Sequence, residues 1–338
     1  MLAEFTPPVP PDLGAVPRTA TVLVRSAEEL RRALRQARTS AVRLDGSALD
    51  RVLGVDRERG RAEIQAAARW ASLAEHPALA PLGLDAFTTE FGAAQTVGES
   101  VNVNWAGPDG APMSRHIAAI TLVTPDGELR RADRESNPDL FRLAVGGQGV
   151  FGVLYSVTLD LASLGAAAAA AQPPVRLALG DESAAAGSAS ALELLVPPLA
   201  LERFLDAVRR MAAERRVALR HISVRRTLAE DETRLRWARR DWAAVHIRFA
   251  ARGSLGAAVY AAETRRELLA QALDCGGSFP VRDLRDATRA QLEACYPALG
   301  VVLAEKRRAD PADRLQNAWL RRARAILRED RCESRWSH

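Results

Sequence analysis

Two groups of small residues in this 338-residue chain could hold an anionic ligand through main-chain N–H groups. The first is TVGES at 96–100, followed by Asn102 and Asn104, and the second is GGQGVFG at 146–152. Glycine lets the backbone approach a ligand without interference from a Cβ atom, and successive N–H groups can line up on a pyrophosphate. Either motif alone is weak evidence, because most glycines only turn the chain. Their pairing is more specific and predicts a dinucleotide site.

Regular elements must position the two motifs. Between them, the sequence predicts a hairpin about Pro125–Asp126–Gly127 and a helix capped by Asn137, with Pro138 at its first position, where a missing N–H costs nothing. Before them, Ser26 and Glu29 have the capping-box spacing at the start of a helix. We expect strands at 19–24, 51–56, 61–67, 117–124, 128–132 and 152–161, helices at 28–38, 69–76 and 138–145, and a long loop at 81–98.

The composition changes after the last of these strands. Residues 162–190 are rich in Ala, Gly and Ser, which predicts a low-complexity linker. Beyond it, a strand-helix-strand-strand-helix pattern predicts a second α+β layer. The expected units are a Pro-rich N-terminal arm at 1–17, a first domain at 18–161, the linker at 162–190, a second domain at 191–287, and a C-terminal helical segment at 288–338 that packs back on the first domain.

The stretch 96–160 resembles the flavin domain of FAD-linked oxidases of the vanillyl-alcohol oxidase type. TVGESVNVN, TPDGELRRADRESNPDLF and AVGGQGVFGVLYSVTLDL follow the order of that domain, and YPALGVVLAEKRRADPADRLQNAWLRR is similar to the closing segment of the sugar-lactone oxidase-like branch. The resemblance implies an α+β, two-domain PCMH-type FAD-binding fold with an α+β substrate (cap) domain. The positions that it implies for FAD contacts are Thr96, Val97, Gly98, Ser100, Val101, Asn102, Asn104, Gly146, Gly147, Gly152 and Val153.

Three departures from the family stand out. Its members carry a glycine-rich GGRHS loop that holds the pyrophosphate, and whose histidine often bonds the flavin covalently. This chain has no Gly-x-x-His-Ser and no histidine before His76, so that attachment is not possible, and Gly46–Ser47 is at best a remnant of the loop. Glu99 stands where the second glycine usually lies, and we expect its carboxylate to crowd and repel a pyrophosphate. At 279–283, where relatives carry tyrosines, FPVRD has none.

Other side chains give weaker signals. His116, His221 and His246 are isolated in patterned segments, and a structural role is favoured for each, although His221 and His246 could face a common cleft. Residues 306–308 match the family's closing helix and are expected to cover the domain interface, with a place near the flavin phosphates as the alternative. No catalytic residue is assigned. Acidic residues flanked by arginines predict a salt-bridged surface without chemistry: Asp231, Glu232 and Asp241.

Composition limits the classes of partner. The formal net charge is +5 and the pI is near 9.7, but 46 of the 47 basic residues are arginines interleaved with acids, with no cluster of aromatic residues beside them. We therefore expect no nucleic-acid partner. Three cysteines without metal-ligand spacing predict no metal site and a reducing compartment. With no signal peptide and no membrane span in the sequence, we expect a cytoplasmic location.

Two functions follow from the resemblance and its gaps. The first is an FAD-dependent oxidoreductase that oxidises an alcohol, polyol or sugar-lactone-type substrate by hydride transfer to the flavin. The second is a cofactor-free, degenerate homologue that acts as a binding or scaffold protein, for which a protein partner is expected. The missing loop, Glu99 and the absent tyrosines favour the second. The two glycine motifs favour the first.

Overall fold

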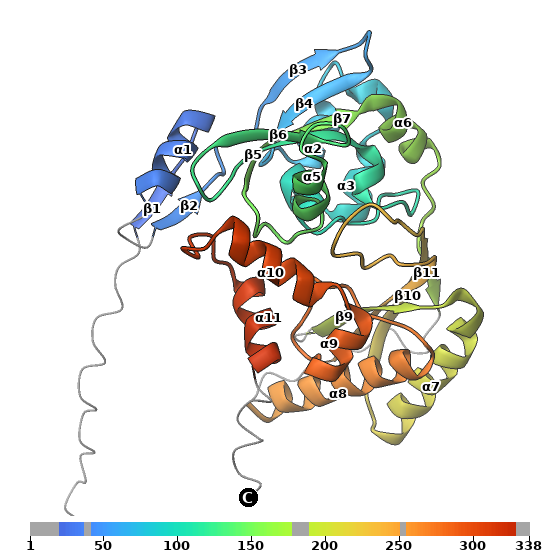
Figure 1. The fold of residues 1–338 in the computed structure, drawn as a ribbon. Coiled ribbons are helices and arrows are strands. Elements are labelled where there is room, and N and C mark those ends of the chain that lie inside the picture. Colours follow the sequence, from blue (N-terminus) through green and yellow to red (C-terminus); the bar gives the residue numbers. More distant parts are fainter. Residues whose placement is uncertain (1–19, 37–41, 178–188, 251–254, 329–338) are drawn as a thin grey trace, which may run out of the picture.

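The computed structural model describes residues 20–36, 42–177, 189–250 and 255–328. In them lie a two-stranded parallel sheet, a five-stranded sheet and a four-stranded sheet. Figure 1 shows the five-stranded sheet in the upper half of the molecule and the four-stranded sheet in the lower half. The C-terminal helices lie beside the region where the two halves meet. The protein is thus built from two α+β layers. No helix in the described ranges is long and apolar enough to cross a membrane.

A small βαβ unit comes first in the chain. Strands β1 (Ala20–Leu23) and β2 (Val42–Asp45) are parallel and are joined through α1 (Ala27–Gln36). The helix begins where predicted, since the Ser26 hydroxyl accepts the Glu29 N–H. Its apolar face is fully buried against the larger unit. The residues of this contact are Val24, Leu30, Ala33, Leu34, Leu49, Val123 and Leu315.

The five-stranded sheet is antiparallel, in the order β3-β4-β7-β5-β6. The predicted hairpin at Gly127 forms, and a second hairpin joins the expected strands on either side of Gly60; both glycines have the left-handed conformation that their turns require, at φ 86° and 61°. Strand β7 lies at the centre and follows the second glycine motif directly. The strands are β3 (Val52–Asp56), β4 (Arg61–Gln65), β5 (Ile117–Val123), β6 (Leu129–Asp133) and β7 (Val153–Asp160).

The loop predicted at 81–98 is instead mostly helical. It contains α3 (Asp85–Phe91) and the first turn of α4 (Val97–Asn102). Phe87 and Phe91, four residues apart, fall on one helix face and pack on Trp70, with Phe87 stacked on it at 4.6 Å between ring centroids. The aromatic contact with Trp70 therefore stabilises α3. The polar residues and glycines of this segment had indicated a loop rather than a helix. The other helices here are α2 (Trp70–Glu75), η1 (Ala80–Leu82), η2 (Met113–His116) and α5 (Pro138–Ala144).

The linker predicted at 162–190 also contains regular structure. Its alanine run forms α6 (Leu161–Ala169), which Asp160 caps by accepting the Ser163 N–H. Alanine has the highest helix propensity, and Leu164 anchors the helix in the core. Strand β8 (Val175–Leu177) follows and joins the second sheet. The low-complexity composition therefore failed to indicate the helix and the strand that lie within 161–177.

The second sheet is antiparallel, in the order β8-β10-β11-β9. Its face toward α7 and α8 is apolar, and the buried side chains of α7, which include Phe204, Leu205 and Val208, pack there. Successive strand residues point to opposite faces, so the other face, which we call the inner face, carries the polar residues of the same strands. The elements are β9 (Ala189–Val196), η3 (Pro198–Ala200), α7 (Leu201–Glu214), β10 (Leu219–Thr227), β11 (Trp242–Ala250) and α8 (Leu255–Asp274).

The C-terminal segment connects both units. Helices α9 (Arg289–Cys295), α10 (Leu299–Ala309) and α11 (Ala318–Arg328) follow the second sheet. Between α10 and α11, Arg314 donates to the Pro125 carbonyl, and Asn317 donates to the Gln148 carbonyl, both in the first unit. This segment therefore packs back on the first domain. The predicted arm at 1–17 and Cys332 lie outside the described residues.

Candidate functional site

The two glycine motifs lie side by side. The Gly146 N–H donates to the Val101 carbonyl at 2.9 Å, and the Gln148 N–H donates to the Asn102 carbonyl at 2.8 Å. Gly149, at φ 71°, lies against the Asn102 side chain. We call this contact of 96–104 with 146–153 the glycine junction. Segments about 45 residues apart in the sequence therefore meet in one place.

Glu99 is turned away from this junction. TVGES forms the N-terminus of α4, where Thr96 and Glu99 make a capping box: the Thr96 hydroxyl accepts the Glu99 N–H at 3.2 Å, and the Glu99 carboxylate accepts the Thr96 N–H at 3.1 Å. The Glu99 side chain is exposed. The expectation that it crowds a pyrophosphate therefore has no support in the structure, and local helix capping explains the residue.

The junction glycines are needed for packing within the protein. A Cβ atom on Gly98 would lie 2.7 Å from the Ala66 carbonyl oxygen, and one on Gly147 would lie 1.9 Å from the Leu143 carbonyl oxygen. Their N–H groups are also used internally: Gly98 donates to Ala66, and Gly147 donates to Ala144. Most of the predicted FAD-contact residues are buried here, namely Val97, Gly98, Ser100, Val101, Asn104, Gly146, Gly147 and Gly152, whereas Thr96, Asn102 and Val153 are half-buried.

Three polar groups remain at the junction. The Asn104 Nδ2 and the Trp105 Nε1 are buried without a hydrogen-bond partner among the described residues, and the half-buried Asn102 amide lies beside them in the chain. Unpaired buried donors are rare and call for an explanation, such as a ligand. Trp237, from the segment between β10 and β11, covers this place and donates its indole N–H to the Asn104 carbonyl at 2.9 Å.

The remnant Gly46–Ser47 offers few free amides. The Ser47 N–H donates to the Asp45 carboxylate at 3.0 Å, and the Leu49 N–H donates to the Gly46 carbonyl. That Ser47 hydrogen bond lowers the pKa of Asp45. The Asp45 carboxylate therefore already accepts the Ser47 N–H, which could otherwise donate to a phosphate.

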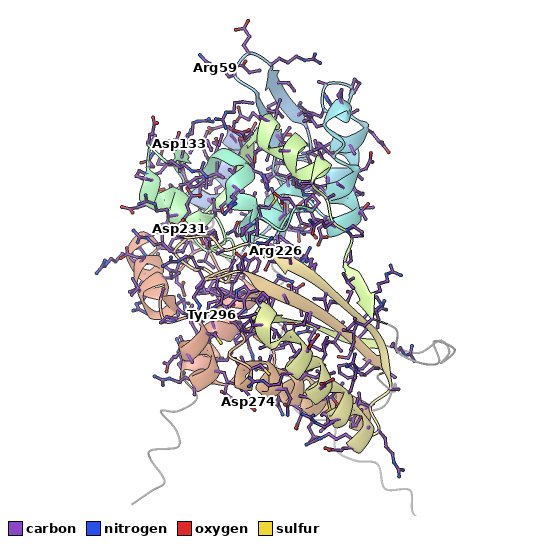
Figure 2. All side chains as sticks on the ribbon, turned by 90° about the vertical axis from the view of Figure 1, so that its right-hand side faces the viewer. Arg59, Asp133, Arg226, Asp231, Asp274 and Tyr296 are labelled. Carbon is purple, nitrogen blue, oxygen red and sulfur yellow. The ribbon has the colours of Figure 1, made fainter. Side chains whose placement is uncertain are left out.

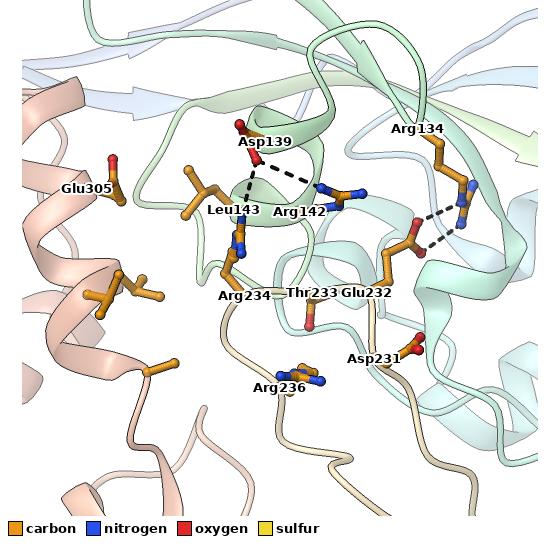
Figure 3. Close-up of a pocket in the computed structure, with 13 residues that line it drawn as sticks. Arg134, Asp139, Arg142, Leu143, Asp231, Glu232, Thr233, Arg234, Arg236 and Glu305 are labelled. Atoms are coloured by element: carbon orange, nitrogen blue, oxygen red, sulfur yellow. Dashed lines mark hydrogen bonds and ion pairs between the residues drawn. The ribbon is translucent and has the colours of Figure 1, made fainter.

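A large hollow of about 980 Å³ lies between α5, the 228–241 segment and α10 (Figure 3). Its charges are mostly neutralised within the protein: Arg134 pairs with Glu232 at 2.7 Å, and Arg234 pairs with Asp139 at 3.0 Å. Asp241 pairs with Arg226 elsewhere at 2.8 Å. The salt-bridged surface predicted for Glu232 and Asp241 is confirmed. We assign no ligand to this hollow, because these four side chains already neutralise one another.

A second hollow, of about 650 Å³, lies between the two units, and we call it the interdomain pocket. On one side are α3 and the segment after α4, and on the other is the inner face of the second sheet. Arg176, Ser223, His246 and Glu193 are direct register neighbours on β8, β10, β11 and β9, and all four line the pocket. They form a row of polar side chains across the sheet, which we call the inner-face row.

Charges from both units meet at this pocket. Arg225 of β10 forms an ion pair with Glu90 of α3. Arg282 pairs with Glu193 at 3.2 Å and lies over the Trp105 ring at 4.4 Å from its centroid. Burial, and then the charge of Arg282, lower the pKa of Arg225 to about 10, so it stays protonated at neutral pH. These contacts fix the two units against each other around a polar chamber.

Among the titratable groups that line the interdomain pocket, the one whose pKa lies nearest to neutral pH is His246. Burial lowers its pKa, the Glu193 carboxylate opposes that effect, and the nearby His221 and arginines reinforce it. The ring is therefore uncharged at pH 7 and can accept a proton. The His221 and His246 ring centroids are 6.2 Å apart, but only His246 lines the interdomain pocket, so a cleft common to both histidines stays a prediction. His116 is structural: it is buried, with Nδ1 2.7 Å from the Ser163 hydroxyl.

Two further groups have positions that the sequence left open. Lys306 is fully buried and ion-paired with Asp310, whose carboxylate also accepts the Arg314 and Leu315 N–H groups. It therefore shapes the closing segment that reaches the glycine junction. Tyr296, inside the lower unit in Figure 2, donates its hydroxyl to the Phe279 carbonyl. A phenol thus reaches the 279–283 stretch from another element, but burial raises its pKa far above the usual value.

Comparison with known proteins identifies the fold. Residues 33–133 match the FAD binding domain family. The match supports a relationship to FAD-linked oxidases over that segment. A solved structure of alkyldihydroxyacetonephosphate synthase superposes with a TM-score of 0.58 and 11% identity, covering 87% of this chain and 75% of that chain. The predicted fold class, a two-domain α+β PCMH-type FAD-binding fold, is confirmed.

Two relatives share a shorter segment with this chain. Over 114 residues it is 35% identical to L-galactono-1,4-lactone dehydrogenase 1, mitochondrial, of Oryza sativa subsp. japonica, and 32% identical to L-galactono-1,4-lactone dehydrogenase, mitochondrial, of Arabidopsis thaliana. The match covers 33% of this chain and 19% and 18% of those proteins. The chain therefore shares about a fifth of their length.

The match to the FAD binding domain supports FAD as the cofactor, as the sequence predicted. The chemistry of two buried donors fits such a group, because the Asn104 Nδ2 and the Trp105 Nε1 have no partner among the described residues and FAD is rich in acceptor oxygens and nitrogens. The main-chain donors of the junction fit less well, because the protein already uses most of them.

Sequence reasoning missed the interdomain pocket. Its lining residues Glu90, Glu193, Ser223 and Arg225 come from three elements, and none belongs to a motif. The usable signal was the alternation of β10, which places His221, Ser223 and Arg225 on one face. Pairing with β9 and the closure of α3 over that face are tertiary facts.

Proposed function

We propose that this protein is an FAD-dependent oxidoreductase that oxidises an alcohol, polyol or sugar-lactone-type substrate bound in the interdomain pocket. The observation that carries the proposal is the pocket itself: a polar chamber lies between an FAD-binding domain and a cap sheet, with an uncharged histidine in its wall. Ligand pockets of this size are typical of small-molecule enzymes and often lie between domains. The relatives named as lactone dehydrogenases support the substrate class.

FAD would be held at the glycine junction. We assign the Asn102 and Asn104 amides and the Trp105 indole N–H as side-chain donors, with main-chain surface of 96–104 and 146–153 as the wall. FAD supplies the hydride acceptor when bound. Because Trp237 covers Asn104, binding at that residue requires the 228–241 segment to shift.

The residues of the inner-face row would act on the substrate. His246, neutral at pH 7, accepts the proton of the substrate hydroxyl as the carbinol carbon gives up its hydride, and the product is a carbonyl compound. Arg225 and Arg282 hold acceptor oxygens of the substrate while keeping their carboxylate partners. Trp105 supplies a flat apolar wall on the FAD side.

An absorbance experiment tests the proposal. Purified protein is incubated with excess FAD and desalted, and its spectrum is recorded anaerobically before and after adding glycerol, hexitols or sugar lactones. We expect retained flavin bands that bleach with at least one substrate class. His246→Gln should retain flavin and bleach about a hundredfold more slowly, whereas His76→Gln, outside the pocket, should behave as the wild type. Retained flavin that no alcohol bleaches would refute the oxidation.

A second candidate function has specific support. The internally bonded amides of the junction, the Asp45 carboxylate on Ser47 and the absent GGRHS loop favour a binding or scaffold protein that dispenses with FAD. Protein that takes up no FAD at millimolar concentration, while remaining folded by circular dichroism, would favour this function over the first. A cytoplasmic location stays a prediction, and the two relatives are mitochondrial by name.

A further inference from the structure

A smaller hollow of about 410 Å³ adjoins the interdomain pocket, and we call it the side pocket. The two share four lining residues, Pro108, Gln172, Pro173 and Arg225. The side pocket lies where β8 ends and β10 continues, so it passes around the sheet edge toward α7. Arg226, at its rim, marks the level where the two units meet (Figure 2). The two hollows are therefore immediate neighbours, with these four residues at their common border.

The two parts differ in chemistry. The interdomain pocket carries the polar inner-face row, whereas the side pocket is walled mainly by apolar residues: Val175, Leu177, Leu201, Leu205, Val224 and Trp242. Three charged residues also border the side pocket, but each has a partner. Arg225 pairs with Glu90, Arg226 pairs with Asp241, and the Asp109 carboxylate lies 3.6 Å from the buried His116 ring. The surface left for a ligand is thus apolar.

We infer that the substrate is an amphiphile, with its hydroxyl-bearing end in the interdomain pocket and an unbranched alkyl chain in the side pocket. This inference rests on the proposed function for the identity of the reacting end. A polyol would leave the side pocket unused or would bury hydroxyls against apolar walls, which is unfavourable. An alkyl chain gains from every methylene that it buries there.

A homologous series measures the effect directly. The probes are 1,2-alkanediols of three to ten carbons, and their dissociation constants for FAD-treated protein are determined by isothermal titration calorimetry. Each buried methylene should tighten binding by about fourfold, until the side pocket is full and the affinity levels off. An affinity that does not change along the series would overturn the inference.

Two variants localise the effect. Ala243→Leu fills the side pocket from β11 and should bring the plateau to a shorter chain, with the three-carbon diol unaffected. Val175→Thr replaces an exposed wall residue with an isosteric polar one and should flatten the gain for the longest diols. The matched control is Val259→Thr on α8, which is similarly exposed, at 58% against 64%, and lies outside both pockets. Equal effects of the two threonine variants would contradict the assigned site.

The inference and the proposed function fail separately. If affinity rises with chain length but no diol bleaches the flavin, only the oxidation is wrong. If the shortest diol bleaches the flavin and longer ones bind no tighter, only the amphiphilic substrate is wrong.

Discussion

The glycine junction and the interdomain pocket differ in how they treat their polar groups. At the junction, the backbone amides and glycines suggested by the sequence are turned inward, bonded to neighbouring carbonyls and packed against them. In the pocket, side chains from distant segments present charges and an uncharged histidine to an open chamber. A motif therefore marks where backbone segments must approach closely, whether the approach serves a ligand or the fold. Chemistry needs groups that remain accessible.

The largest effect is expected for Gly147→Ala, which tests whether the glycines of the glycine junction serve packing within the protein. An added Cβ atom would lie 1.9 Å from the Leu143 carbonyl oxygen, so the backbone has to move. We expect the free energy of unfolding to fall by at least about 3 kcal/mol, measured by urea denaturation. Gly300→Ala is the control, because nothing lies within 4 Å of its added Cβ atom and alanine favours the helix. Equal stabilities of the two variants would contradict packing as the role of Gly147.

Lys306→Met tests how the closing segment holds the junction. It leaves the buried Asp310 carboxylate without its cation, which we expect to cost about 3 kcal/mol of unfolding free energy. Arg308→Gln breaks an exposed pair with Glu305 and should cost less than about 1 kcal/mol. Chemical denaturation of both variants gives the comparison, and a Lys306 variant as stable as the Arg308 variant would exclude a structural role for this buried pair.

We expect the interdomain pocket, but not the glycine junction, to give the rate of flavin reduction a pH dependence. Burial lowers the pKa of His246 below its usual 6.5. The histidine is neutral, and can accept a proton, when the pH is above this lowered pKa. The rate of flavin reduction should therefore rise with pH through the lowered pKa. The unfolded histidine binds protons more readily, so this group contributes stability above about pH 6.5 that declines as the pH falls. His246→Gln should abolish the pH step in the rate, and a step that persists would assign it to another group.

The smallest expected effect concerns Glu99. Glu99→Gln keeps a hydrogen-bond acceptor for the Thr96 N–H and should change stability by less than about 0.5 kcal/mol. Thr96→Ala removes the hydroxyl cap and should cost about 1 kcal/mol. Because Glu99 is exposed and turned to Thr96, FAD affinity, measured by fluorescence titration, should be the same in Glu99→Gln and wild type. Tighter FAD binding by Glu99→Gln would restore the view that this carboxylate repels the phosphates.

Local sequence signals located most of the first unit. The turns at Gly60 and Gly127 follow from short-range backbone preferences, as does the N-terminus of α1, and a single sequence shows these directly. Two segments were misjudged for opposite reasons. Helix α3 depends on Trp70 for its stability, and α6 lies in an alanine run whose composition indicated a linker while its helix propensity indicated a helix.

By itself, the sequence determined the resemblance to FAD-linked oxidases, the α+β class and the pairing of two glycine motifs, because local spacing and motif order persist in the chain whatever it contacts. Only the tertiary structure decided that Glu99 caps a helix, that the junction amides are already bonded, and that Glu90, Glu193, Arg225 and His246 share one pocket. The physical reason is that accessibility, charge pairing and the pKa of His246 depend on which distant segments bury each group, and no spacing along the chain encodes that burial.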